Sequence, residues 1–400
     1  MIDYLNPQSS LKAINAFIFA GSFTIGVMRA GFHVDRILEI SDDQPYKNAF
    51  YFIQNSKIPI IIPSIWNDID YLKSLNDVDL MCCNCPCSSL SAINRQASLD
   101  GKNNIHFYRL FDIFNLVQPK VFVIENAPTL ITLGLPILKD CVKQLQGYNV
   151  TIIRDYAGNH GVAMQRQRTL VVGWNTAYFP HIPLIPQDPQ PHVTVKDVLG
   201  DIYDDTTDNM KSQSCEDIKS LYCYCPPNTS LMTGLVKSYM NGNLSILKKI
   251  ESTKHFKEFI RIMKKIKEKS NYWDKSPFKL KDEGLFPSFT SVTEYIHPHQ
   301  NRLLNLREMA RIMNYPDDFD FSKKCKVPVT QAMAQGVPAN FGQYIANNIR
   351  KALQGELNAF VEGEVCYQHH IKHRYVTYNR SDFLSLSVLD VDSHSKKLKE

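Results

Sequence analysis

Between residues 16 and 173, short apolar runs alternate with segments whose apolar residues recur at helical spacing. Each run has the length of a buried strand, and strands that alternate with helices build a mostly parallel sheet. The sequence therefore predicts an α/β fold with a doubly wound sheet. The expected strands are 16–20, 36–40, 79–83, 120–124, 151–156 and 169–173, and the expected helices are 25–30, 107–117 and 136–146.

The alternation ends near Trp174. Five prolines follow between residues 175 and 200, and they predict irregular chain at the start of a second, smaller domain. Helical spacing returns at 246–266, 302–314 and 340–353. With 400 residues, 44% of them hydrophobic, the chain can bury the core of one large domain and of a smaller one.

Positive charge is concentrated in one segment. Residues 248–281 hold 12 Lys and Arg against 4 Asp and Glu, whereas the whole chain has a net charge of only +5. A basic segment on a nearly neutral body suits a polyanion such as nucleic acid. The same pattern is also typical of a solvated helix face, so this segment alone leaves both interpretations open.

The cysteines and the apolar runs indicate the cellular compartment in which the protein is expected. Four of the ten cysteines crowd between Cys82 and Cys87, which does not fit a disulfide framework, so we expect a reduced, cytoplasmic setting. No apolar window approaches the roughly 18 residues of a membrane span, and the N-terminus does not resemble a secretion signal. His369, His370 and His373 lie in a polar stretch near the end, which favours a surface segment over a metal site.

The first expected strand ends in Phe19-Ala20-Gly21, and the second ends near Glu39. A loop that brings backbone close to a ligand, followed by an acid that accepts hydrogen bonds from ribose hydroxyls, is the layout of an adenosine-binding βαβ unit. Phe-Ala-Gly also ends many strands that bind nothing, so this motif is weak by itself.

The third expected strand runs into a loop that places Cys87 directly after Pro86. A thiol at this edge of a doubly wound sheet can act as a nucleophile if a neighbour lowers its pKa or takes its proton. Two other interpretations stay open, a metal cluster and a set of small buried thiols. Cys83, Cys85 and Cys87 would point the same way in an extended segment, but the paired Cys-x-x-Cys spacing is absent.

Polar residues also flank two later strands. Glu125 and Asn126 follow an apolar run, which places a carboxylate at the carboxyl end of a strand, although such a Glu can simply mark a strand leaving the core. Arg166 and Arg168 alternate just before the last expected strand of this half. They fall on one face and can clamp an anion or a base.

These segments, in this order, resemble the cytosine-C5 DNA methyltransferase family, whose members use S-adenosylmethionine. The resemblance covers residues 16–175 and 287–349, more than half of the chain. Further matching motifs are Ile296-His297-Pro298, the segment from Arg302 to Glu308, Tyr315-Pro316-Asp317-Asp318-Phe319 and Gly336-Val337-Pro338. Where the family usually carries Gln after its Pro-Cys, this chain has Ser88.

The resemblance implies a Rossmann-like methyltransferase fold and a DNA (cytosine-5)-methyltransferase. Cys87 would add to C6 of cytosine, and Glu125 would stabilise the protonated N3. Arg166 and Arg168 would orient the base, which must be flipped out of the duplex to react. The residues implied in S-adenosylmethionine binding are Phe19, Ala20, Gly21, Glu39, Ile40, Asp68, Ile69, Pro86, Gln335 and Gly336, and those implied in substrate binding are Ser88, Asn126, Arg166 and Arg168.

The resemblance also implies a domain organisation. Residues 1–174 would form the catalytic domain, 175–295 an inserted target-recognition domain, 296–355 a return segment and 356–400 a C-terminal extension. The expected partner is double-stranded DNA, with a cognate restriction endonuclease, a monomeric state and a bacterial or phage-like setting. No metal is expected. Two alternatives remain, a tRNA cytosine-5 methyltransferase of the same family and a catalytically weak DNA-binding regulator.

Overall fold

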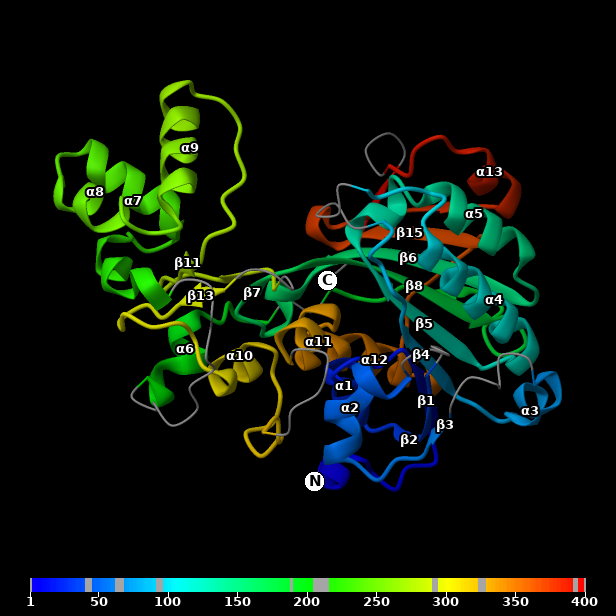
Figure 1. The fold of residues 1–400 in the computed structure, drawn as a ribbon. Helices are drawn as coiled ribbons and strands as arrows, with labels where there is room; N and C mark the ends of the chain where they lie inside the picture. Colours follow the sequence, from blue (N-terminus) through cyan, green and yellow to red (C-terminus); the bar gives the residue numbers. More distant parts are fainter. Residues whose placement is uncertain are drawn as a thin grey trace. The chain divides into compact units, whose positions relative to one another are not determined.

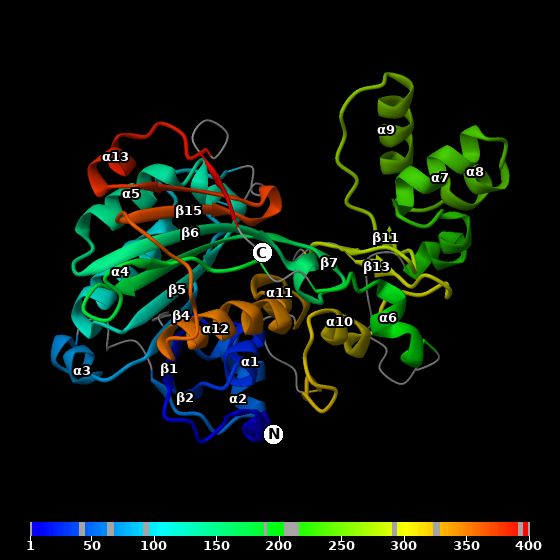
Figure 2. The same cartoon turned by 180° about the vertical axis from the view of Figure 1, so that it is seen from behind.

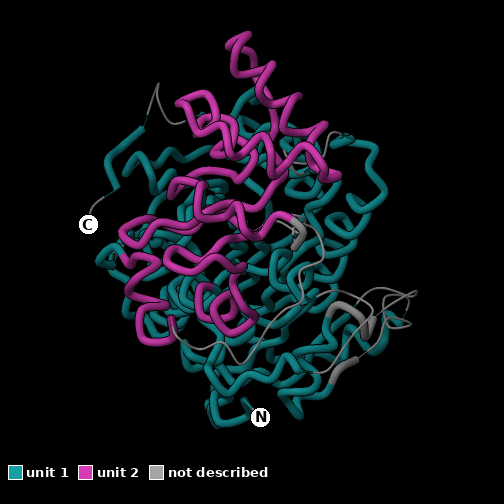
Figure 3. The backbone as a smooth tube through the Cα atoms, turned by 60° about the vertical axis from the view of Figure 1, so that its left-hand side comes forward, with its two compact units in different colours: residues 1–192, 313–400 teal, residues 193–312 magenta. Residues whose placement is uncertain are grey.

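The computed structural model of this chain divides into two compact units. Unit 1 comprises residues 1–192 and 313–400, and unit 2 comprises residues 193–312 (Figure 3). Unit 2 covers much of the segment that the sequence sets apart at 175–295. The structure describes residues 2–39, 45–61, 68–90, 96–187, 190–203, 216–289, 294–322, 329–390 and 395–398.

Unit 1 is built on a ten-stranded sheet with the order β17-β16-β15-β6-β8-β5-β4-β1-β2-β3 (Figure 1). These strands are β1 (Lys12–Ala16), β2 (His33–Leu38), β3 (Ile60–Ile61), β4 (Leu80–Asn84), β5 (Val121–Asn126), β6 (Tyr148–Tyr156), β8 (Gln167–Asn175), β15 (Val365–His369), β16 (Arg374–Tyr378) and β17 (Lys396–Lys397). The neighbours from β3 to β5 are all parallel, whereas β8 runs antiparallel to both β5 and β6. The predicted α/β class and methyltransferase-type sheet are confirmed.

Helices cover both faces of this sheet. They are α1 (Ser22–Arg29), α2 (Pro45–Asn55), α3 (Ile69–Ser74), α4 (Ile105–Val117), α5 (Leu135–Gln144), α11 (Val329–Gln335), α12 (Ala339–Leu353) and α13 (Arg380–Ser385). Helices α4, α5 and α13 lie on one side, and α1 and α12 lie on the other (Figures 1 and 2). Under α4, Phe114 stacks on Phe122 of β5 with ring centroids 3.9 Å apart. A Cβ on Gly173 would lie 1.9 Å from the Phe122 ring, so only glycine fits there.

Short elements complete unit 1. They are η1 (Ile2–Leu5), η3 (Lys102–Asn104), η4 (Pro128–Ile131), η5 (Ala157–His160), η8 (His370–Lys372), β7 (Met164–Gln165), β9 (Ile182–Pro183) and β14 (Phe360–Val361). Strand β14 pairs antiparallel with β9, so the chain beyond α12 returns to the segment that follows β8.

The strand predicted at 16–20 is wrong. Strand β1 ends at Ala16, and the apolar residues that follow it form a turn. Within this turn Phe17, Phe19 and Gly21 have φ values of 53°, 50° and 87°, in the left-handed region that a strand cannot contain. The run is apolar because the turn is buried, not because it is extended.

The predicted surface position of the C-terminal histidines is also wrong for two of them. His369 and His370 are 6% and 0% exposed, whereas His373 is exposed. Strand β15 pairs parallel with β6 on one side and antiparallel with β16 on the other. All five residues of β15 are buried, so this part of the segment beyond residue 356 belongs to the interior of the large sheet.

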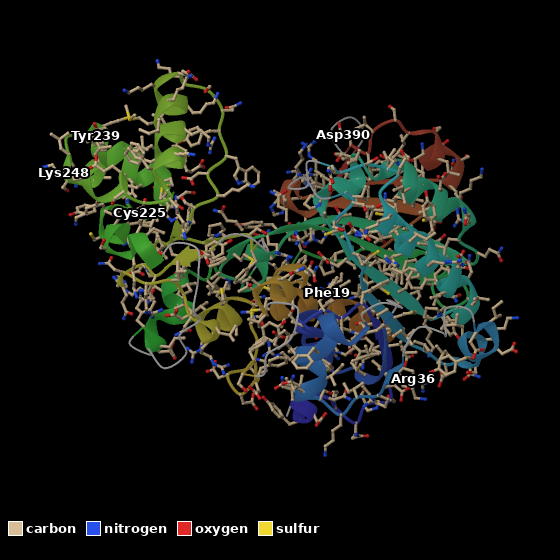
Figure 4. The ribbon with its side chains drawn as sticks, in the orientation of Figure 1. Phe19, Arg36, Cys225, Tyr239, Lys248 and Asp390 are labelled. Atoms are coloured by element: carbon tan, nitrogen blue, oxygen red, sulfur yellow. The ribbon has the colours of Figure 1, made fainter. Side chains whose placement is uncertain are left out.

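Unit 2 is mainly helical and has a small core of its own. Its elements are α6 (Val195–Leu199), η6 (Gly200–Ile202), η7 (Glu216–Tyr224), β10 (Thr229–Ser230), α7 (Leu231–Met240), α8 (Ser245–Ile250), α9 (Phe256–Lys267), β11 (Phe278–Lys279), β12 (Phe286–Pro287), β13 (Tyr295–Ile296) and α10 (Leu306–Ile312). Its core includes Phe259 of α9 and Leu235 of α7. Cys225, Tyr239 and Lys248 belong to this helical part (Figure 4).

The single helix predicted at 246–266 is two helices, α8 and α9. The Thr253 side chain donates to the Ile250 carbonyl at 2.8 Å and accepts from the His255 N–H at 3.2 Å. A threonine that satisfies nearby backbone groups competes with the helical hydrogen bonds, which ends α8.

The helix predicted at 302–314 is shorter, because its start is capped. The Glu308 N–H donates to Asn305 Oδ1 at 2.8 Å, and the Asn305 N–H donates to Glu308 Oε2 at 2.7 Å. This reciprocal pair starts α10 at Leu306. Across the described parts of the chain, no helix has both the length and the apolar character needed to span a membrane.

Candidate active site

Two parallel strands bring the predicted nucleophile and the predicted acid to one edge of the sheet. Strand β4 pairs with β5 so that Asn84 lies opposite Glu125. The chain leaves β4 after Asn84 and reaches Cys87 three residues later. Because both strands end at the same edge, the loop with Cys87 and the carboxylate of Glu125 face a common region.

The four clustered cysteines have different surroundings. Cys82, Cys83 and Cys85 are buried, and burial raises the pKa of each thiol well above its usual value. Cys83 and Cys85 belong to the apolar core under α4 and α5. Cys87 is only half-buried. Within the described ranges, no three His, Cys, Asp or Glu side chains are grouped so that they could hold a metal ion.

Charged side chains act on the Cys87 thiol. Burial raises its pKa, and Arg168 is the strongest influence that opposes this rise. Glu125 raises the pKa further, and Arg166 lowers it. The charges of Glu125, Arg166 and Arg168 therefore all influence the pKa of the Cys87 thiol.

Glu125 is held from two directions. Its side chain is 5% exposed and forms an ion pair with the Arg168 guanidinium through Oε1. Its other oxygen, Oε2, accepts a hydrogen bond from Asn84 Nδ2 at 3.2 Å. Asn84 is a site residue that the sequence analysis missed, although its place at the last position of a strand, three residues before Cys87, was a usable signal.

The side chains of the two arginines have different partners in the structure. Arg168 reaches Glu125 and also donates to the Gln167 carbonyl at 2.8 Å. Arg166 is 1% exposed and donates through Nη2 to the carbonyls of Ala334 and Gly336, at 2.8 and 2.6 Å. Arg166 thus ties the strand segment to the turn between α11 and α12, while Arg168 faces the acid.

The remaining substrate-side candidates are local anchors. Ser88 is exposed, and its hydroxyl accepts a hydrogen bond from the Asn103 amide. Asn126 is buried, and its Oδ1 accepts from the Ala127 N–H at 2.8 Å. Pro86, which is predicted to bind the cofactor, is half-buried and precedes Cys87. The hydrogen bonds of Ser88 and Asn126 thus anchor the loop after β4 and the end of β5, respectively.

The turn after β1 has the features expected of a cofactor loop. Figure 4 shows Phe19 in this turn, between β1 and α1. Ala20 is buried beside it, and the Gly21 N–H donates to the Ile18 carbonyl at 2.8 Å, closing the turn. Bulky residues in left-handed conformation cost energy, so the surrounding fold must hold Phe17 and Phe19 in place.

Glu39 lies just beyond the end of β2 and is 5% exposed. Its Oε1 accepts a hydrogen bond from the Ile18 N–H at 2.9 Å, which joins it to the Phe19 turn. Burial raises the pKa of Glu39, the hydrogen bond from Ile18 opposes that rise, and the net pKa is about 8. A buried acid with one backbone donor retains acceptor capacity for ligand hydroxyls.

The turn at Gln335-Gly336 meets the start of α1. A Cβ on Gly336 would lie 2.6 Å from Ser22 Oγ, so the close approach requires glycine. The Gln335 Oε1 atom is buried and has no hydrogen-bond partner among the residues that the structure describes. An orphaned acceptor next to the cofactor loop fits a ligand that carries N–H donors, such as the ammonium group of S-adenosylmethionine.

Two predicted cofactor residues, Asp68 and Ile69, are not brought to this turn by any contact among the described residues. Asp68 is exposed and caps α3, where its Oδ1 accepts from the Tyr71 N–H at 2.9 Å. Ile69 is 51% exposed. Ile40 lies outside the described residues.

The fold and the site define an α/β methyltransferase with a cysteine at the carboxyl edge of its sheet. Residues 11–351 match the family of C-5 cytosine-specific DNA methylases, so the chain belongs to that family. It is a DNA (cytosine-5)-methyltransferase of the S-adenosylmethionine-dependent type.

Similar proteins agree with this assignment. The chain is 26% identical to the type II methyltransferase M.MthTI of Methanothermobacter thermautotrophicus, over 86% of this chain and 98% of that protein. It is 25% identical to the type II methyltransferase M.PspPI of Psychrobacter sp. (strain TA137), over 89% of this chain and 82% of that protein. An E. coli prophage protein described as a DNA modification methyltransferase has the same fold, with a TM-score of 0.59, 18% identity and coverage of 86% and 99%.

Proposed function

We propose that Cys87 is the nucleophile with which this enzyme methylates C5 of a cytosine flipped out of duplex DNA. The observation that carries the proposal is the buried Glu125–Arg168 ion pair at the sheet edge where β4 leads into the Cys87 loop. The charges of Glu125, Arg166 and Arg168 all influence the Cys87 thiol. The two arginines oppose the effect of burial on the thiol, which favours the thiolate that nucleophilic attack needs.

The first step is addition of the Cys87 thiolate to C6, which turns C5 into an enamine carbon. N3 takes up a proton from solvent as negative charge develops there, and the Glu125 carboxylate, which Asn84 keeps in place, stabilises the protonated N3. Bound S-adenosylmethionine supplies an electrophilic methyl group for C5. Loss of the C5 proton to solvent water then reforms the C5–C6 double bond and expels Cys87 as a thiolate, which restores the enzyme.

For the cofactor we propose the turn after β1 and the turn before α12. The Phe19 ring would cover the adenosine, Glu39 would accept from the ribose hydroxyls, and Gln335 would accept from the ammonium group. Ala20, Gly21, Pro86 and Gly336 would line the same region, while Asp68 and Ile69 would approach the adenine edge together with Ile40. The fit rests on the buried acceptors of Glu39 and Gln335.

We further propose that unit 2 is the target-recognition domain and that the large sheet with α12 is the catalytic domain. The exposed basic residues of α9 support contacts with phosphates. Of the aromatic residues that could meet the duplex, Trp273 is 46% exposed, whereas Tyr222 is 1% exposed and belongs to the core of unit 2. Type II relatives support a cognate restriction endonuclease, and we expect a monomer that works in the cytoplasm.

The deciding experiment offers tritiated S-adenosylmethionine with duplex genomic DNA, single-stranded DNA and total tRNA in parallel. We expect label in duplex DNA, at C5 of cytosine after hydrolysis. Label in tRNA alone would overturn the proposed substrate. Specific duplex binding without any label would indicate a catalytically weak regulator.

A further inference from the structure

Unit 1 contains a second group of buried ionisable side chains, which the reaction as proposed does not use. Its centre is Asp155 near the end of β6, which has no exposed surface. Asp155 Oδ2 lies 3.0 Å from His160 Nε2 and 2.8 Å from His370 Nδ1. Both imidazole rings are buried as well. A carboxylate shared by two buried histidines is costly to build unless the geometry is well satisfied.

The rings are fixed by neighbours from other elements. His160, in η5, stacks on Tyr344 of α12 with ring centroids 3.7 Å apart. The Nε2 atom of His370 lies 3.1 Å from the Gln368 amide oxygen, so both nitrogens of that ring have partners. Burial by itself raises the pKa of Asp155, but the influence of His370 and His160 outweighs it and holds the pKa below its usual range. Asp155 is therefore an ionised acceptor.

This cluster is joined to the arginine segment by the backbone. In the antiparallel ladder between β6 and β8, Asp155 is the partner of Arg168. Asp155 Oδ1 accepts from the Tyr156 N–H at 2.6 Å. The next residue, Ala157, donates its N–H to the Arg166 carbonyl at 2.8 Å. The carboxylate thus fixes the stretch of β6 and η5 on which both arginines depend for their position.

His370 comes from a part of the chain that the family match does not include, because the match ends at residue 351. We propose that His370 is a positioning residue for methyl transfer, and that the C-terminal β15–η8 segment holds Asp155 and thereby the Arg166–Arg168 segment in register. The proposal rests on the proposed function, since it assumes that Arg168 serves the reacting base.

A matched pair of substitutions tests the hydrogen bond itself. In His370→Asn, the amide nitrogen can take the place of Nδ1 and donate to Asp155, whereas His370→Leu leaves the carboxylate without that donor. His373→Asn is the control, because His373 is exposed and lies three residues away in the same turn. For each variant, the single-turnover methylation rate, the affinity for duplex DNA and the melting temperature are measured.

We expect His370→Leu to lower the single-turnover rate about tenfold or more, because small misplacements of catalytic groups have effects of this size. Duplex affinity should stay within about twofold of the unaltered enzyme, and His370→Asn should recover most of the rate. Equal losses in the Asn and Leu variants, or a lowered melting temperature with an unchanged rate, would overturn the proposal. If the Leu variant does not fold, Asp155→Asn takes its place. A rate well below those of His370→Asn and the control supports the proposal, and a rate equal to that of the control overturns it.

A double-substitution cycle adds a readout that a merely structural role would not change. If His370 acts through Arg168, its replacement should have little further effect on the rate in an Arg168→Lys background. Fully additive effects would contradict the proposal. An unaltered enzyme that labels no DNA would instead count against the proposed function, so the two failures are distinguishable.

Discussion

The carboxyl edge of the unit 1 sheet and helix α9 of unit 2 both carry charged side chains. Those at the edge are buried, whereas those on α9 are largely exposed. At the edge, Glu125 and Arg168 have side chains only 5% and 13% exposed, and they bind each other. On α9, Lys264 is 75% exposed, and its ammonium group lies 3.8 Å from Glu268. Buried charges in fixed geometry act strongly on nearby atoms, whereas exposed charges are screened by salt. From this difference we expect the chemical step to take place at the edge and the helix to supply non-specific DNA affinity.

The largest effect should follow from removing the thiol. Cys87→Ala should lower the single-turnover rate by about 10⁴-fold or more, because no covalent step remains. Duplex affinity should change little, since the affinity is assigned to unit 2. Transfer of tritium from S-adenosylmethionine measures the rate, and Cys223→Ala, an exposed cysteine of unit 2, is the control. Substantial activity in Cys87→Ala would remove this residue from the mechanism.

The next effect concerns the acid. Glu125→Gln should slow methyl transfer by about 10²-fold, the usual loss for a positioned acid-base group. Cofactor affinity, measured by calorimetry, should be unchanged. An unaltered single-turnover rate would show that the buried ion pair with Arg168 is structural only.

The pH dependence should follow from the raised pKa of Cys87. Because the thiol must lose its proton before attack, the rate should rise about tenfold per pH unit until the pH reaches that pKa. Arg168→Gln removes the cation that most opposes the rise in pKa, so its profile should shift to higher pH. The comparison uses single-turnover rates from pH 6 to about 10.5, so that the range extends beyond the ordinary pKa of a thiol. A flat profile in both proteins would argue against thiolate attack as the step that limits the rate.

The smallest effect should come from α9. Replacing Lys264, Lys265 and Lys267 by Glu should weaken all duplexes alike and reduce the salt slope by about two to three, while the chemical step at saturating DNA stays unchanged. The control reverses three exposed lysines of unit 1, at positions 57, 73 and 143, with the same change in net charge. A change in the preferred sequence at a constant salt slope would identify α9 as a base reader.

The parts of the site that the sequence predicted are those whose signals are local. Cys87 and Glu125 each follow an apolar run, and parallel pairing of neighbouring strands is enough to bring them together. Arg166 was also found, but not its contacts, because Ala334 and Gly336 lie 168 and 170 residues away.

The misses have a common physical cause. His370 is 215 residues from Asp155, and a polar stretch of sequence does not reveal that the sheet will bury it. The apolar run at Phe17 and Phe19 predicts a strand, but it forms a turn, because burial and not extension determines its apolar composition. A local sequence pattern cannot predict which residues are buried by contacts with distant parts of the chain, whether those residues are polar or apolar.

The most direct test of the central claim is covalent trapping. The enzyme is incubated with S-adenosylmethionine and a duplex in which 5-fluorocytosine replaces cytosine, so that the final elimination cannot occur. The account predicts a methylated adduct that survives denaturation and that peptide mass spectrometry places on Cys87. An adduct on another cysteine, or methylation of the ordinary duplex without any adduct on the fluorinated one, would contradict it.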